Sequence, residues 1–179
     1  MQRSRWCPSP KPKLALSAQE AHLVKIWIEN QDEIREILER ALVGRLGVIA
    51  GGEPYIVPLN YVYAGGRIYF HTGLEGRKFE GIGGDRPACF EVDELLEIVP
   101  NEQACLYTAY YRSVIIMGKT RLLEDENEKM RALEFLLKKY TGAVPVEPPP
   151  VHALAIVNVC EITPDRITAK ANLPATEPG

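Results

Sequence analysis

Residues 55–78 read YIVPLNYVYAGGRIYFHTGLEGRK in one-letter code. Two runs rich in β-branched and aromatic residues, 55–63 and 67–72, flank the pair Gly65-Gly66. Glycine permits the positive φ values that tight hairpin turns require. The pattern therefore predicts two antiparallel strands joined by a short turn.

A hydroxyl and two cations close this stretch where the second strand ends. Thr72 is the last residue of the strand, and Arg77 and Lys78 follow at the start of a short helix expected over 78–83. Guanidinium and ammonium groups make charge-assisted hydrogen bonds to phosphate, and backbone N–H groups at a helix start add more. Because cations are mildly unfavourable in a first helical turn, their presence suggests a bound anion. The stretch predicts a phosphate monoester site beside an attached aromatic ring, as in flavin mononucleotide (FMN).

Pro58 stands in the middle of the first strand, although proline has no N–H to donate to a neighbouring strand. Either this strand lies at a sheet edge or is bulged there, or something other than a strand lies beside it. The sequence leaves these alternatives open.

The rest of the chain continues the hairpin order, with few helices. Helices are expected over 32–42, where apolar residues recur at helical spacing, and over 126–140. Around Val24–Ile28 the signal fits either a strand or a helix that begins at a capping box over 17–20. The expected strands are 45–50, 54–63, 67–72, 88–96, 113–123 and 154–162, with a turn at 163–165 and a short edge strand over 166–170. This order favours an antiparallel barrel over a parallel sheet.

Length and composition limit the classes of protein. With 179 residues the chain suffices for one domain, and we expect an arm over 1–16, one domain over 17–171 and a disordered tail over 172–179. A net charge of −3 without a basic stripe disfavours nucleic-acid and anionic-membrane partners. No window approaches about 20 uninterrupted apolar residues, so no spanning helix is expected. Four scattered cysteines indicate a reducing cytoplasm and no metal site.

Five blocks carry a resemblance to a known family. They are GRLG (44–47), PYIVPLNY (54–61), IYFHT with GRK (68–72 and 76–78), PACFEVD (87–93), and YRSV (111–114) followed by Gly118. Together they resemble the flavin-binding split-barrel family of pyridoxamine 5'-phosphate oxidase, and most closely its branch related to 5-nitroimidazole reductases. The resemblance implies a mainly β protein, a six-stranded antiparallel Greek-key split β-barrel with flanking helices, that works as a homodimer with FMN at the interface.

The resemblance also implies roles for individual residues. Arg77 and Lys78 would grip the flavin phosphate with the Thr72 hydroxyl, and His71 would lie beside the flavin, where it is the candidate for a catalytic role. The backbone of Tyr55–Pro58 and the amide of Asn60 would hydrogen-bond the ring edge. The cofactor-binding residues implied are Tyr55, Ile56, Val57, Pro58, Asn60, His71, Thr72, Arg77, Lys78, Arg112 and Ser113.

Three departures from the oxidase pattern bear on function. Gly76 stands where the oxidase has a serine, and Ser113 stands where it has a glutamine that meets the flavin. No tryptophan follows Trp27, whereas the oxidase ends in a segment with tryptophan and arginine that completes its sites. Oxidation of pyridoxamine phosphate is therefore not expected.

The functional hypothesis is an FMN-dependent oxidoreductase that acts on a small organic substrate with a separate electron donor. Two alternatives stay open: a flavin- or haem-binding module without turnover, and a deazaflavin-dependent reductase on the same barrel. A haem would need an axial ligand, and His71 is the candidate within the predicted site.

Overall fold

The computed structural model describes residues 24–104, 107–142, 144–147 and 149–174. The strands within these ranges are β1 (Val24–Trp27), β2 (Gly44–Ala50), β3 (Glu53–Leu59), β4 (Val62–Ala64), β5 (Arg67–Thr72), β6 (Arg86–Val99), β7 (Thr108–Leu122) and β8 (Asn158–Leu173). The helical elements are α1 (Gln31–Arg40), the 3-10 turn η1 (Arg77–Glu80), α2 (Glu126–Thr141) and the 3-10 turn η2 (Val151–Ile156). Both predicted α-helices are confirmed, and η1 replaces the short helix expected over 78–83.

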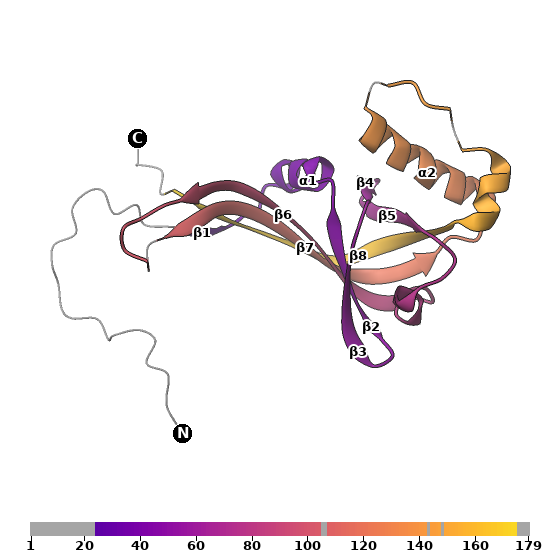
Figure 1. The fold of residues 1–179 in the computed structure, drawn as a ribbon, viewed down its shortest axis with the longest axis horizontal. Helices are drawn as coiled ribbons and strands as arrows, with labels where there is room; N and C mark the ends of the chain where they lie inside the picture. Colours follow the sequence, from indigo (N-terminus) through magenta and orange to yellow (C-terminus); the bar gives the residue numbers. More distant parts are fainter. Residues whose placement is uncertain (1–23, 105–106, 143, 148, 175–179) are drawn as a thin grey trace.

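All the described strands belong to one antiparallel sheet in the order β3-β2-β6-β7-β8-β5-β4, with β1 added to β8. Leu46 of β2 and Phe70 of β5 come from opposite ends of this order, yet they share one buried core. The sheet therefore curls around that core as a barrel that stays open between its two edge strands, β3 and β4 (Figure 1). The predicted antiparallel barrel is confirmed.

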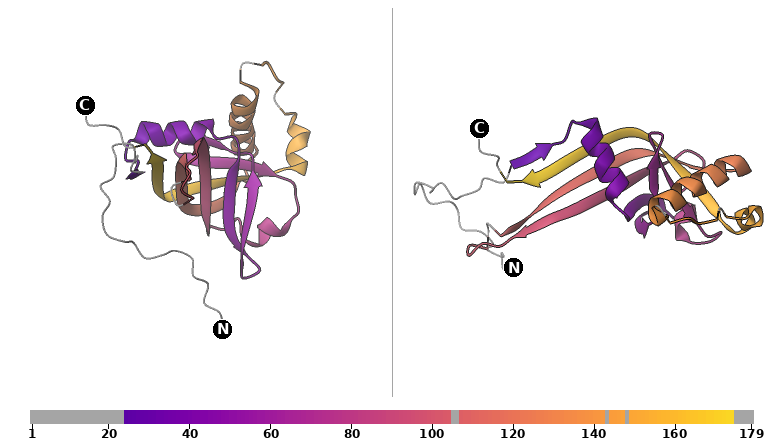
Figure 2. Two further views of the ribbon diagram at one scale, coloured as in Figure 1. Left: turned by 60° about the vertical axis from the view of Figure 1, so that its left-hand side comes forward. Right: turned by 90° about the horizontal axis from the view of Figure 1, so that it is seen from above.

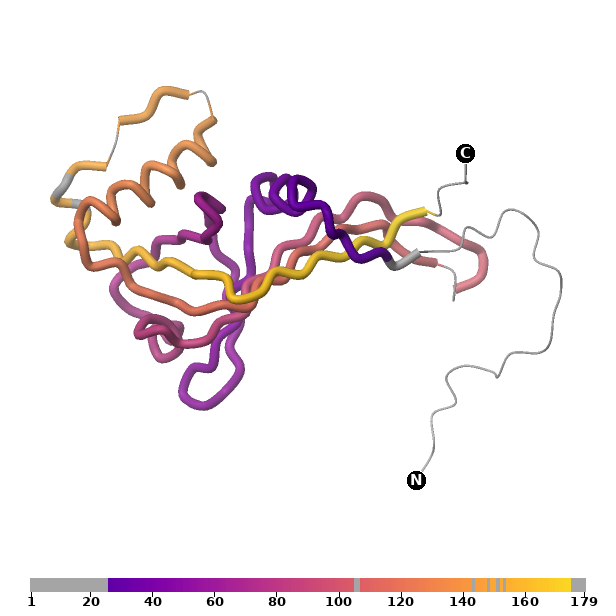
Figure 3. Tube along the Cα trace, turned by 180° about the vertical axis from the view of Figure 1, so that it is seen from behind, coloured from indigo at the N-terminus to yellow at the C-terminus, as the bar shows by residue number. Residues whose placement is uncertain are grey.

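Long strands extend the sheet beyond the barrel. β6, β7 and the end of β8 run side by side away from α2, and β1 joins β8 at the far end (Figures 1 and 2). Figure 3 shows β8 passing from the α2 side to this extension without interruption. β1 resolves the alternative left open at 24–28 in favour of a strand. The proposed capping box and the arm over 1–16 lie outside the described residues.

Each α-helix begins at a side-chain cap and buries one apolar stripe. Asn30 accepts hydrogen bonds from the N–H groups of Asp32 and Glu33 at the start of α1, and Asp125 accepts one at the start of α2. α1 packs Ile37 and Leu38 against the barrel core. α2 covers the outer face of β4, β5 and β8, where its leucines form a second buried cluster.

The prediction of a single strand over 54–63 is wrong, because the chain forms two strands there. β3 ends at Leu59, and after Asn60 and Tyr61 the chain pairs with β5 at the other edge of the sheet as β4. Tyr61 is fully buried, and its hydroxyl donates to the Leu38 carbonyl at 2.6 Å. The split therefore carries the chain from one edge of the barrel to the other and places a tyrosine in the core.

The C-terminal end of α2 fixes this crossing. The Tyr140 hydroxyl accepts a hydrogen bond from the Tyr61 N–H at 2.9 Å and donates to the Leu42 carbonyl at 2.6 Å. The Lys139 ammonium donates to the Ala41 carbonyl at 2.8 Å and lies 3.7 Å from the centre of the Tyr61 ring. Burial lowers the pKa of Lys139 to about 8. These bonds join α1, α2 and the start of β4 into one rigid unit.

The predictions of a strand over 154–162 and of a turn after it are also wrong. Residues up to Ile156 form η2, and β8 runs without a turn through Thr163 and Pro164 to Leu173. The extra residue, Asp165, is absorbed by a register shift opposite Gly118 of β7. The described sheet thus has eight strands, where six and a short edge strand over 166–170 were expected, and β8 continues two residues past the domain end expected at 171.

Candidate functional site

The free edge of β3 offers an unusual set of backbone groups. The two-residue turn Gly51-Gly52 makes Ala50–Glu53 a hydrogen-bonded pair, so residues 54, 56 and 58 direct their backbone groups away from β2. Pro54 and Pro58 have no N–H. The free edge therefore presents carbonyls and one donor, the N–H of Ile56.

The position of β3 decides between the alternatives that the sequence left open at Pro58. β3 lies at the end of the described sheet and pairs with β2 alone, so the edge-strand alternative is confirmed. Prolines at such positions protect an edge against pairing with another chain. The same pattern leaves one donor and neighbouring acceptors for a small ring: the Ile56 N–H can donate to one carbonyl of a flavin ring edge while the ring N–H donates to a free carbonyl of β3.

The two predicted phosphate ligands lie beside the start of β3. Arg77 of η1 forms an ion pair with Glu53 and stacks 5.4 Å from the centre of the Tyr55 ring. Lys78 lies 5.3 Å from the centre of the Phe79 ring, and no ion pair involves it among the described residues. Gly76 holds φ at 131°, a value that favours glycine, and so sets the turn into η1. η1 thus brings Arg77 to the start of β3, with Lys78 next to it in the chain, and the Glu53 carboxylate competes for Arg77.

The other end of the β3 edge opens onto an apolar cavity of about 400 Å³. Asn60, which follows β3, and His71 of β5 bring polar groups to its wall. The remaining lining comes from α2 and the segment after it: Leu133, Leu136, Leu137, Tyr140, Glu147 and Pro149. Thr72 follows His71 in an extended strand, and it is buried where His71 is exposed, so the two side chains occupy opposite faces of β5.

Comparison with known proteins identifies the family. A family model described as pyridoxamine 5'-phosphate oxidase matches residues 30–171. The chain belongs to this family. No curated protein matches the chain.

Solved structures support the assignment of this oxidase-family chain to the split-barrel fold. A Bacteroides thetaiotaomicron protein, proposed to confer 5-nitroimidazole antibiotic resistance, is 29% identical with a TM-score of 0.71, over 83% of this chain and 88% of that one. An FAD- and haem-binding protein from Mycobacterium smegmatis is 15% identical with a TM-score of 0.75, and the match covers 86% of this chain and 75% of that one. An FAD-binding protein from Mesorhizobium loti is 22% identical with a TM-score of 0.61, and the match covers 84% of this chain and 100% of that one. At these lower identities the last two show the fold alone.

Arg112 and Ser113, which the resemblance places at the flavin, make no contact with Arg77 or Lys78 within the described part of one chain. Arg112 is bonded to Glu94 of β6 at 2.7 Å, and Glu33 of α1 lies 3.6 Å away. Ser113 is the next residue of an extended strand, so it faces the opposite side of the sheet, the side that also exposes Ile115. Arg112 thus holds α1 on the barrel, and Ser113 lies on an open sheet face.

Several residues of the candidate site carry no motif in the sequence. Glu53 reaches Arg77 through the fold, and the leucines of α2 read as an ordinary apolar helix stripe. Among the described residues no group of three metal-binding side chains comes together, and no helix there is long and apolar enough to span a membrane.

Proposed function

We propose that the chain binds FMN along the free edge of β3. The phosphate would meet Arg77, Lys78 and the Thr72 hydroxyl, and the ring would lie along β3 toward Asn60. The observation that carries this proposal is the free edge of β3, which has cations at one end, a lone donor between carbonyls in the middle and a cavity at the other end.

The reaction we propose is oxidation or reduction of a small organic molecule held in the apolar cavity. A bound flavin supplies the hydride or electron chemistry, and the protein binds and orients the reactants. Asn60 and His71 would hydrogen-bond the polar atoms of the substrate, and the α2 leucines would exclude water from it. No lysine or arginine lines this cavity among the described residues, and Glu147 adds a carboxylate to its wall, which disfavours a phosphorylated substrate. A separate electron donor and a cytoplasmic location complete the proposal.

The decisive experiment identifies the chromophore of freshly purified protein by mass spectrometry and titrates the apoprotein with FMN. We expect FMN to bind with a Kd of about 1 μM or tighter. FAD, a deazaflavin or haem in its place would assign the site to that cofactor and contradict the FMN proposal. Protein without chromophore that leaves flavin fluorescence unchanged on mixing would refute flavin binding altogether.

We also propose that a second copy of the chain covers the open sheet face that exposes Ser113. The sheet register aligns Ile56, Gly47, Cys89 and Met117 across neighbouring strands of this face. Ile56 is 68% exposed and Met117 38%, so the row is apolar and uncovered. A dimer built on it would bring Ser113 of one copy near the β3 edge of the other.

Light scattering should give the mass of a dimer at micromolar concentration, and Gly47→Glu should convert it to a monomer. A Cβ at Gly47 would make its nearest contact at 3.4 Å, so the folded chain accepts a side chain there. Val144→Glu, at an exposed apolar residue of the segment after α2, is the control and should leave the dimer intact. A dimer that persists in folded Gly47→Glu protein would place the interface elsewhere.

A further inference from the structure

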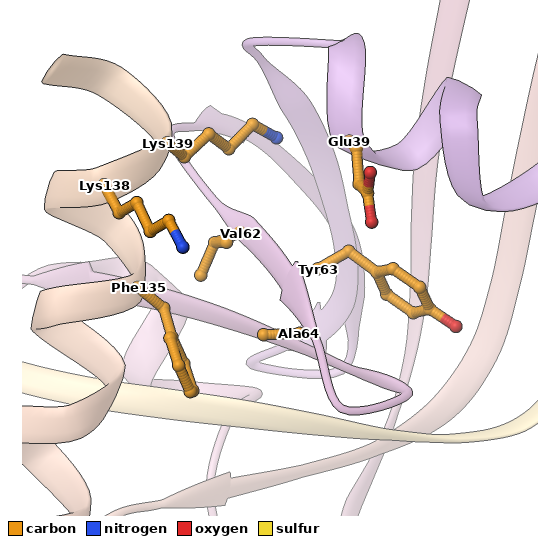
Figure 4. Close-up of a pocket in the computed structure, with 7 residues that line it drawn as sticks. All are labelled: Glu39, Val62, Tyr63, Ala64, Phe135, Lys138 and Lys139. Carbon is orange, nitrogen blue, oxygen red and sulfur yellow. The ribbon is translucent and has the colours of Figure 1, made fainter. Parts of the chain in front are cut away.

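A second cavity, of about 430 Å³, lies along the free edge of β4 (Figure 4). β4 is the last strand of the described sheet and pairs with β5 alone. The cavity touches Val62, Tyr63 and Ala64, which are consecutive residues. Since successive side chains of a strand point to opposite faces, a cavity that touches all three follows the strand edge rather than one face.

The hairpin register shows which backbone groups face this cavity. Gly65 and Gly66 form a two-residue turn with positive φ, which makes Ala64–Arg67 a hydrogen-bonded pair. Tyr63 therefore directs its N–H and C=O away from β5. An unpaired donor and acceptor on a strand edge are the groups to which an extended peptide adds as a further strand.

The walls of the cavity carry opposite charges. Lys138 and Phe135 come from α2, and Glu39 comes from α1 on the facing wall (Figure 4). No ion pair involves Lys138 or Glu39 among the described residues, so the Lys138 charge is available to a ligand, while Glu39 also interacts electrostatically with Lys139 at the cavity wall.

The two walls are held at a fixed separation. Lys139 follows Lys138 on α2, and its ammonium donates to the Leu38 and Ala41 carbonyls at the end of α1. Tyr140 adds its bond to the Leu42 carbonyl. The cavity is therefore preformed, which lowers the entropy cost of binding a ligand in it.

We propose that this cavity binds a dipeptide-sized zwitterion, which pairs its backbone with Tyr63 and places its carboxylate at Lys138 and its ammonium at Glu39. An apolar side chain of the ligand would pack between Phe135 and Ala64. Two extended residues span about 7 Å, within the roughly 10 Å length of the three-residue β4. The cavity shares no lining residue with the cavity at the end of β3, so the two sites can be tested separately.

The test is an NMR titration of the full chain with alanylphenylalanine, followed through the backbone amides of residues 62–64. We expect saturable shifts at these amides. Lys138→Met and Glu39→Gln should each weaken binding about fivefold, the upper range for exposed ion pairs. Lys129→Met, on the same helix but outside the cavity, should leave the affinity unchanged.

Modified probes separate the charge and backbone contributions. Amidation of the peptide carboxylate should lower affinity in wild-type protein and remove the effect of Lys138→Met. Methylation of the peptide-bond nitrogen should abolish binding if backbone pairing with Tyr63 holds the ligand. Absence of saturable shifts with alanylphenylalanine, or equal affinities for the free and doubly capped peptides, would overturn the proposal.

Discussion

The double variant Arg77→Ala/Lys78→Ala is expected to bind FMN about 100-fold to 10,000-fold more weakly than wild-type protein. Each side chain would donate a hydrogen bond to a charged phosphate, worth about 1.5–3 kcal/mol. Riboflavin lacks the phosphate, so its affinity should change little. Fluorescence titration of both variant and wild-type apoprotein with both ligands measures the difference.

The Glu53→Gln variant is a control that should change FMN affinity in the opposite direction. The Glu53 carboxylate forms an ion pair with Arg77 and would repel a phosphate beside it. Its removal should free the guanidinium and tighten FMN binding, while riboflavin binding stays as it was. Equal losses of FMN and riboflavin in the double variant would show that the cations support the fold of η1 rather than the phosphate.

The second large effect is expected on stability, from Gly118→Ala. An added Cβ at Gly118 would overlap the Thr163 carbonyl oxygen and lie 3.1 Å from the Pro164 Cα, both of which belong to the backbone of β8. Because backbone atoms cannot rotate away, the two longest strands of the sheet would have to separate at the register shift. We expect a loss of about 3 kcal/mol or more in the free energy of unfolding.

For a chain of this length such a loss lowers Tm by about 6–12 °C. Thermal unfolding followed by circular dichroism, without added flavin, measures it. Gly73→Ala is the matched control, since no heavy atom lies within 4 Å of the added Cβ and φ is not in the left-handed region. A Tm for Gly118→Ala within about 1 °C of the control would mean that β7 and β8 accommodate the side chain by shifting.

Local patterns in the sequence were sufficient to predict the hairpin turns and both α-helices, and they also carry the prediction of a phosphate site. A hairpin turn, a helix cap and an apolar stripe each depend on residues within a few positions of one another. The Gly51-Gly52 and Gly65-Gly66 turns are local in this sense, and so is the succession of Thr72, Arg77 and Lys78. Pro58 also limited β3 to a few environments, because the missing N–H is a property of the residue itself.

Pairing between distant segments decided the rest. The split of 54–63 into β3 and β4 depends on Tyr140, which is 79 residues from Tyr61. β8 continues through Thr163 and Pro164 because β7 provides a partner strand with a glycine opposite the extra residue. Tyr140 and β7 both lie far along the chain from the segments they contact. Local patterns therefore could not predict either pairing, and the sequence pointed to a turn at 163–165 instead.

The candidate site also combines features that belong to single residues with features that depend on contacts between distant segments. The sequence by itself determined which residues could hold a phosphate and which strand lacks N–H donors, because charge and the proline ring belong to single residues. Only the tertiary structure decided that Asn60 and His71 meet at a cavity closed by α2, that Glu53 competes for Arg77, and that Arg112 turns toward α1 instead. These are distances between segments far apart in the chain, and they are fixed by the packing of the whole barrel around one core.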